Sequence, residues 1–177
     1  KLVGAGEAVA GWIGLYADAD GSVVSVDTMG IVHCYAVVSG IEDPGGVGGW
    51  QLSITSSNGD LVFGETYPVP LINLNSFPDQ MVGCGQPIGG PGLVIMFEFN
   101  IFVTSPGWLA IERLTPDLPI GYVGWNDNEF RQFQFAYGSE GEPIFSYGGA
   151  PPPEENIVSG VVPVVGTRWG DVKALFR

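Results

Sequence analysis

Two short loops of the sequence carry carboxylates in a pattern that suits calcium. Asp18 and Asp20 alternate with other residues and are followed by Gly21, which is the arrangement of many calcium-binding loops. An EF-hand also needs a carboxylate at the twelfth position, which here, counted from Asp18, is Met29. Asp127, in an Asn-Asp-Asn-Glu run, is the second candidate. Both loops are also ordinary turn sequences, so each is either a calcium site or a simple turn. No cofactor other than calcium is expected.

Residues suited to covalent or acid–base catalysis are scarce. The only histidine, His33, lies in the middle of an apolar segment, and the chain has no Gly-x-Ser-x-Gly motif. Its neighbour Cys34 would point to the opposite face of a strand, so the two cannot form a nucleophile–base pair. Glu98 and Glu112 could supply paired carboxylates for glycoside hydrolysis, but the strand pattern favours solvent-facing positions for both. We therefore do not expect an enzyme.

The two cysteines, Cys34 and Cys84, leave two interpretations open. In an exported protein, a single disulfide between them would close a loop of about 50 residues and contribute roughly 3–4 kcal/mol. The alternative is two buried free thiols. Cys34 is expected within a strand and Cys84 within a glycine-rich loop. The chain contains no Cys-x-x-Cys motif, which argues against zinc-ribbon and c-type haem sites.

The last ten residues, 168–177, differ from the rest of the chain. They hold three of its six basic side chains, whereas the preceding residues carry three basic and eighteen acidic ones. In a helix, Trp169, Val172 and Phe176 would form an apolar stripe on one side, so we predict a short amphipathic helix or docked tail. Ten residues are too few for a stable isolated helix, so the segment must pack on its own domain or on a neighbour. The predicted docking residues are Arg168, Trp169, Val172, Lys173, Leu175, Phe176 and Arg177.

The segments that would position these residues have the period-two pattern of β-strands. In residues 50–55, apolar and polar side chains alternate, and residues 93–103 form the longest apolar run. In that run, one inner face is predicted to consist of Leu93, Ile95, Phe97, Phe99, Ile101 and Val103. Further strands are expected at 11–17, 22–27, 31–38, 61–67, 108–114, 120–125, 130–137, 143–147 and 157–165.

About ten strands, separated by turn signals every eight to twelve residues, predict an all-β fold, an antiparallel β-sandwich. Asp20-Gly21 and Asn58-Gly59 are typical two-residue hairpin turns. We divide the chain into a sandwich at 1–149, a proline-rich spacer at 150–156, and a C-terminal strand with the basic tail at 157–177. Three consecutive prolines favour an extended, semi-rigid spacer.

Composition restricts the partners and the compartment. The net charge is −13 with only 14% charged residues, so there is no basic face for nucleic acid or for anionic membranes. The longest apolar run has eleven residues, too few for a membrane span. Scarce lysine and a start at Lys1 that resembles a mature terminus favour export. We expect an extracellular or cell-surface location after signal-peptide cleavage.

Carbohydrate is a further candidate partner, because exposed aromatic side chains on a sandwich face can bind sugar rings. Trp50 is expected in the core from its alternation, whereas Trp125 lies beside a polar loop. The alternative is that the tryptophans are core or interface residues. The candidates are Trp12, Trp50, Trp108, Trp125 and Trp169.

Two stretches resemble known families. Residues 46–54, after an apolar strand, resemble the early strands of cohesin-like and related carbohydrate-binding sandwiches. Residues 169–177 resemble the Trp-Gly-x-x-Lys-x-x-Tyr/Phe-Arg ending of uncharacterised exported bacterial β-sandwich proteins. The second resemblance implies export and a shared use of the tail, and it implies no activity.

These observations favour an extracellular structural protein that assembles with copies of itself into a fibre or surface layer. The strand at 157–165 would pair with an open sheet edge of a neighbour, and the tail would enter an apolar groove. Contacts of this head-to-tail kind propagate into filaments when they do not close. The alternative is a surface adhesion module, cohesin-like or carbohydrate-binding.

Overall fold

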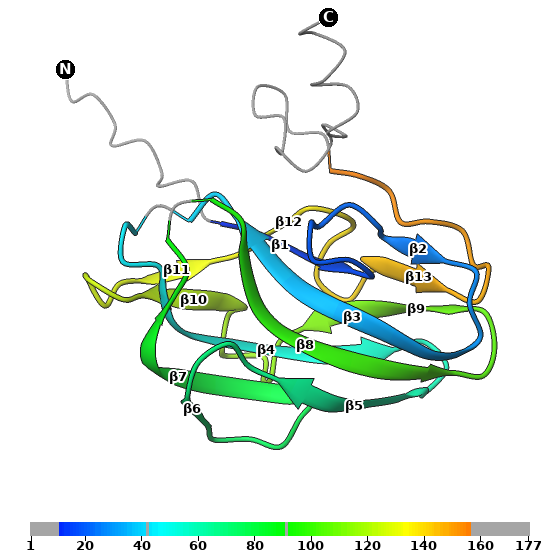
Figure 1. Ribbon diagram of the computed structural model, residues 1–177, viewed down its shortest axis with the longest axis horizontal. Helices are drawn as coiled ribbons and strands as arrows, with labels where there is room; N and C mark the ends of the chain where they lie inside the picture. Colours follow the sequence, from blue (N-terminus) through cyan, green and yellow to red (C-terminus); the bar gives the residue numbers. More distant parts are fainter. Residues whose placement is uncertain (1–10, 42, 91, 157–177) are drawn as a thin grey trace, which may run out of the picture.

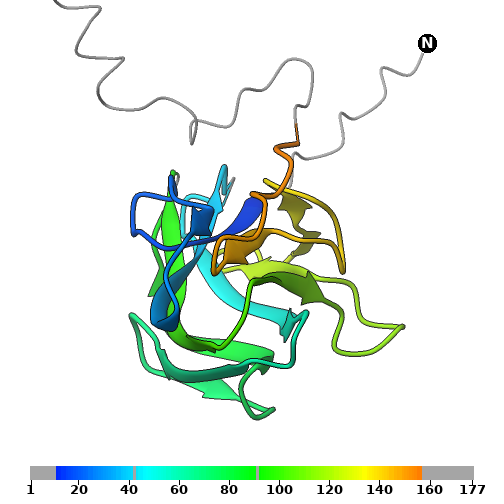
Figure 2. The ribbon, with the colours of Figure 1, turned by 90° about the vertical axis from the view of Figure 1, so that its right-hand side faces the viewer.

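The computed structural model describes residues 11–41, 43–90 and 92–156. Two β-sheets face each other in this part of the chain, which contains no helix (Figures 1 and 2). The predicted all-β sandwich is therefore confirmed. The predicted strand at 157–165 and the tail residues Arg168, Trp169, Val172, Lys173, Leu175, Phe176 and Arg177 lie outside the described residues.

Five strands form the first sheet, in the order β12-β1-β3-β8-β5. They are β12 (Gln134–Phe135), β1 (Trp12–Tyr16), β3 (Gly30–Ser39), β8 (Val94–Val103) and β5 (Leu61–Thr66). The neighbours are antiparallel except β1 and β12, which run parallel.

Eight strands form the second sheet, in the order β11-β10-β4-β9-β13-β2, with β7 also paired to β4 and β6 to β7. They are β11 (Phe130–Gln132), β10 (Gly121–Gly124), β4 (Val47–Ser56), β9 (Gly107–Glu112), β13 (Phe145–Tyr147), β2 (Ser25–Val26), β7 (Asp79–Ile88) and β6 (Leu71–Asn73). Because β2 and β13 are also parallel, each sheet of the predicted antiparallel sandwich contains one parallel pair and is mixed.

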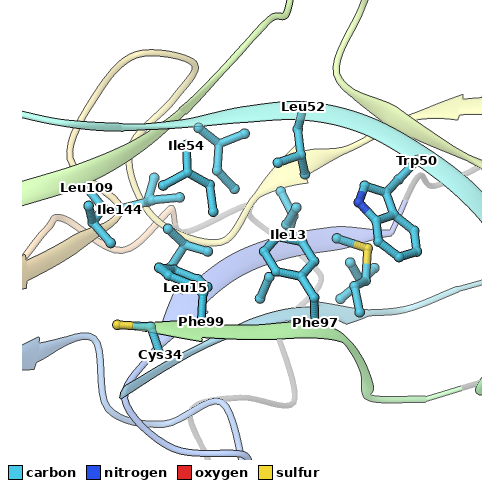
Figure 3. Close-up of a cluster of buried hydrophobic side chains, with 14 of the residues drawn as sticks. Ile13, Leu15, Cys34, Trp50, Leu52, Ile54, Phe97, Phe99, Leu109 and Ile144 are labelled. Atoms are coloured by element: carbon cyan, nitrogen blue, oxygen red, sulfur yellow. The ribbon is translucent and has the colours of Figure 1, made fainter. Parts of the chain in front are cut away.

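The core lies between the sheets and follows the predicted alternation. Trp50, Leu52 and Ile54 of β4 are buried and meet the inner side chains of the first sheet (Figure 3). The Trp50 ring stacks on Phe97, with ring centroids 5.9 Å apart and planes at 15°. This stacking joins β8 of the first sheet to β4 of the second, so Phe97 lies in the contact between the sheets. Aromatic side chains bury the largest apolar areas, so contacts of this kind contribute strongly to stability.

The predicted inner face of residues 93–103 is correct only from Phe97 onward. The pairing with β3 skips Met96, so that Phe97 and Ile95 face consecutive residues of β3. This is a β-bulge, in which two residues oppose one and the side-chain alternation is reset. As a result Val94 and Met96 are buried, while Leu93 is 45% exposed. Local alternation cannot reveal such an inserted residue.

One long strand was missed by the sequence pattern. β7 has ten residues and pairs with β4, but glycines and a proline interrupt its apolar pattern. Cys84, expected in a loop, lies in this strand and pairs with Leu71 of β6.

The two predicted hairpin turns reverse the chain without forming hairpins. The turn at Asp20-Gly21 leads from β1 in the first sheet to β2 in the second. The turn at Asn58-Gly59 leads from β4 in the second sheet to β5 in the first. Turn residues predict a change of direction, but the strands that follow these turns, β2 and β5, pair with β13 and β8 and not with the strands that precede the turns.

Residues 150–156, predicted to be a spacer, are fastened to the sandwich. The Pro151 carbonyl accepts a hydrogen bond from Ser146 Oγ (2.6 Å). Further along, Glu155 forms a β-bridge with Tyr137, and Asn156 Nδ2 donates to the Phe135 carbonyl (2.8 Å). The described chain therefore ends beside β12, at one edge of the first sheet (Figure 1).

Candidate functional site

The first predicted calcium loop is closed by its own hydrogen bonds. Asp18 Oδ1 accepts from the backbone amides of Ser22 (2.9 Å) and Val23 (2.8 Å), and Oδ2 accepts from Ser22 Oγ (2.6 Å). Partial burial raises the pKa of Asp18, but these hydrogen bonds outweigh it and hold the pKa below its usual value. Asp20 is exposed. This arrangement is that of a polar turn.

The second predicted calcium residue is engaged by an arginine. Arg131 Nη2 lies 2.5 Å from Asp127 Oδ2. The hydrogen bond from Arg131, together with one from the Glu129 amide, lowers the pKa of Asp127 to about 2. Within residues 11–41, 43–90 and 92–156, no group of three or more His, Cys, Asp or Glu side chains could hold a metal ion. The geometry therefore gives the calcium prediction no support.

The predicted disulfide between Cys34 and Cys84 is not formed in the structure. Both are free thiols, which was the alternative left open by the sequence. Cys34 lies in β3 with its side chain in the core, while Cys84 lies in β7 of the other sheet. Burial raises the pKa of both thiols, that of Cys84 to about 11, so little reactive thiolate is present near neutral pH.

The tryptophans within the described residues do not form an exposed sugar-binding face. Of the four in the described part of the chain, Trp12 and Trp50 are buried, Trp108 is half-buried, and Trp125 is exposed by 38%. They are distributed over four strands or loops.

A different set of side chains gathers on the outer face of the first sheet. Ile31, Phe102 and Leu61 lie side by side on β3, β8 and β5. Their exposed fractions are 64%, 47% and 63%, although apolar side chains of this size are usually buried. We call these three residues the apolar row. Nothing in the described part of the chain covers it.

A polar row lies next to the apolar row on the same face. His33 Nε2 is 3.0 Å from Glu98 Oε2, and His33 Nδ1 is 3.1 Å from Asn100 Oδ1. The His33 ring also contacts Tyr35 edge-on, with centroids 4.8 Å apart. His33 is thus a surface residue held within a network.

The start of β5, and hence Leu61, is held in place by Asp60. Its Oδ2 accepts a hydrogen bond from the Tyr147 hydroxyl (2.8 Å), and its Oδ1 accepts one from Thr104 Oγ1 (2.8 Å). These bonds tie the beginning of β5 to β13 and to the end of β8. Burial raises the pKa of Asp60, but the hydrogen bonds from Tyr147 and Thr104 outweigh it and hold the pKa below its ordinary value of 3.8.

This lowered pKa predicts a specific acid dependence. The folded protein favours the Asp60 carboxylate, so its stabilising contribution is present above the unfolded pKa and is lost as the pH falls through the folded pKa. We expect Asp60→Asn to lower the free energy of unfolding at pH 7, and this deficit should shrink below the ordinary pKa of 3.8. Urea unfolding from pH 7 to about pH 2 measures the difference. The exposed Asp117→Asn is the control, and a deficit for Asp60→Asn that stays constant with pH would contradict the assignment.

A hollow borders the free edge of β5, next to the turn that joins β6 and β7. Its volume is about 480 Å³. Three half-buried aromatic rings contribute to its wall, with amides, a hydroxyl and one carboxylate beside them. We call it the edge hollow, and it is lined by Val62, Phe63, Gly64, Glu65, Tyr67, Asn73, Asn75, Ser76 and Phe77. Figure 1 shows β5 and β6 together at the lower side of the molecule.

A bulge in β5 places Glu65 at this hollow. The pairing of β5 with β8 jumps between Phe63 and Thr66. Gly64 has a φ of +68°, in the left-handed region that glycine adopts without strain. Glu65 makes no hydrogen bond or ion pair with any residue in the described ranges. Burial raises the pKa of Tyr67, and the negative charge of Glu65 raises it further, as expected for neighbouring groups.

The described residues are strongly anionic. They include sixteen of the nineteen acidic side chains, because Glu7, Glu42 and Asp171 fall outside them. Their only lysine or arginine side chains are Arg113, paired with Glu140 at 2.9 Å, and Arg131, paired with Asp127. These ranges contain no helix that could serve as a membrane span.

Sequence reasoning did not identify the apolar row or the edge hollow. Phe102 stands on the face of residues 93–103 that Glu98 and Asn100 mark as the outer one, and an apolar residue there is the signal that was available. The residues of the hollow come from β5 with the residue after it, and from the end of β6 with the β6–β7 turn, so their proximity depends on tertiary structure.

Comparisons with known proteins give no relative. No protein-family model, no curated protein and no solved structure matches this chain.

Proposed function

We propose that this protein is a self-assembling structural subunit of a fibre or surface layer outside the cell. The C-terminal segment 157–177 of one copy binds the outer face of the first sheet of the next copy. The observation that carries this proposal is the apolar row, since contiguous exposed apolar patches on protein surfaces are often binding sites.

The tail matches the apolar row in size and charge. In a helical conformation, Trp169 and Phe176 stand about 10 Å apart, at 1.5 Å per residue. Ile31 and Leu61 are separated by two strand spacings, which is also about 10 Å. The tail carries a net charge of +2, and the described residues are anionic with both arginines already paired. Apolar side chains can therefore meet while opposite charges face each other.

The position of Asn156 is compatible with a contact between copies. It lies beside β12, whereas the apolar row ends at β5, the opposite edge of the same sheet. Twenty-one extended residues span up to about 70 Å, so the segment is long enough to leave its own domain. The free edge of β5 is also available for strand addition by residues 157–165.

Deleting residues 157–177 tests the proposal. The full chain is expected to increase in mass with concentration in sedimentation experiments and to form assemblies visible by electron microscopy, and the deletion variant is expected to stay monomeric. The deletion starts after Asn156 because residues 150–156 belong to the sandwich. Assemblies that persist unchanged after the deletion would refute the proposal.

Two further variants separate the apolar contact from the charge. Trp169→Ser combined with Phe176→Ser keeps every charge and should still weaken assembly. Phe102→Ser should weaken it roughly tenfold or more, because a phenylalanine side chain contributes about 1.5–3 kcal/mol when buried. Phe130→Ser is the matched control, since Phe130 is 42% exposed on the other sheet. Equal effects of Phe102→Ser and Phe130→Ser would contradict a role for the apolar row.

A further inference from the structure

The edge hollow has the chemistry of a site for a basic side chain. Phe63, Tyr67 and Phe77 offer aromatic rings, and the Glu65 carboxylate has no cation near it among the described residues. A guanidinium group can stack on an aromatic ring while it donates hydrogen bonds to a carboxylate. The side-chain oxygens of Asn75 and Ser76, which also line the hollow, provide further acceptors.

The surroundings favour a cation over other ligands. An anion would meet Glu65 and a domain with fourteen more acidic than basic side chains among its described residues. A metal ion would find only one carboxylate in the lining of the hollow. A wholly apolar ligand would leave the Asn75 side chain and Glu65 without partners, at a cost in desolvation.

The edge hollow is continuous with the apolar row. Leu61 ends that row on β5, and Phe63, two residues further along the same face, lines the hollow. The apolar stripe of the tail is flanked on both sides by arginine, with Arg168 next to Trp169 and Arg177 next to Phe176. Whichever end of the stripe lies over Leu61, an arginine follows in the direction of the hollow.

We propose that the edge hollow binds the guanidinium group of Arg168 or Arg177 from the tail of a second copy, between its aromatic rings and Glu65. The inference rests on the proposed self-assembly and adds the residue that sets the register of the contact. Lysine would be a weaker occupant, because its ammonium group neither stacks on an aromatic plane nor binds a carboxylate through two parallel hydrogen bonds.

A charge swap in the full-length protein tests this site. We expect Glu65→Lys to weaken self-association roughly tenfold at low ionic strength, and less at high ionic strength where charges are screened. Glu142→Lys is the matched control, since Glu142 is also an exposed glutamate, lies away from the hollow, and changes the net charge equally. Circular dichroism and thermal unfolding check that each variant is folded.

The complementary variants identify the arginine. Arg168→Glu and Arg177→Glu are made singly in the wild-type chain and in the Glu65→Lys chain. One of the two should weaken association alone and restore it when combined with Glu65→Lys. Chains carrying only Glu65→Lys, mixed with chains carrying only that arginine change, should associate with each other more strongly than either does with itself, which requires a contact between copies.

The outcomes distinguish the two proposals. Equal effects of Glu65→Lys and Glu142→Lys, or no rescue by either arginine change, overturn the assignment of the edge hollow but leave self-assembly through the apolar row. A wild-type chain that remains monomeric at every concentration overturns both. Rescue by one arginine, with the mixed chains associating, supports the hollow and assigns its occupant.

Discussion

Phe97→Ala should be among the most destabilising single substitutions in this protein. Phe97 is fully buried, and its ring contacts Trp50, Tyr67, Phe77 and Phe99, with centroids between 5.9 and 6.3 Å away. The truncation removes apolar burial and leaves a cavity that the surrounding rings can fill only in part. We expect a loss of about 3–5 kcal/mol in the free energy of unfolding, measured by guanidinium denaturation.

Phe102→Ala is the control for this substitution, because it lies on the same strand and points to the opposite face. Phe102 is 47% exposed, so its truncation should cost less than about 1 kcal/mol. If the two variants were equally destabilised, the assignment of inner and outer faces in β8 would be wrong. The comparison also removes the intrinsic preference of phenylalanine for strands, which is similar for both positions.

Asp43→Ala is expected to have the second large effect. The Asp43 side chain is only 2% exposed. It accepts hydrogen bonds from the backbone amides of Gly45 (2.6 Å), Asn126 (2.9 Å) and Asp127 (3.4 Å). It therefore joins the loop before β4 to the loop after β10. Alanine would leave these amides without an acceptor, and we expect a loss of about 2–4 kcal/mol.

Hydrogen exchange provides a local measurement beside the unfolding free energy. The amide of Asn126 should lose protection in Asp43→Ala, because its acceptor is gone. Asp43→Asn should cost less, since the amide oxygen still accepts. Asp127→Ala is the control for losing an aspartate in the same region, and it should cost much less than Asp43→Ala because its ion pair with Arg131 is near the surface. An equal cost for Asp43→Ala and Asp127→Ala would contradict the role of Asp43.

The roles of Asp43 and of the residues that line the edge hollow could not be predicted from the sequence pattern. Asp43 stands in a loop of glycine and proline, where an aspartate is usually a turn residue, and two of its three partners, Asn126 and Asp127, lie more than eighty positions away. The edge hollow likewise combines β5 with the β6–β7 turn. The two predicted hairpins did not form for a related reason, because spacing along the chain does not determine which strands become neighbours.

The period-two pattern by itself determined the all-β class, most of the strands and the inner faces of β4 and of β8 beyond Phe97. These properties are local, because alternate side chains of a strand point to opposite faces whatever lies next to it. Tertiary structure alone decided the bulge at Met96, the inclusion of the glycine-rich β7 and the pairing of strands between sheets. It also decided that Ile31, Phe102 and Leu61 meet on an uncovered face, since that depends on which strands are adjacent and which segments of the chain lie over them.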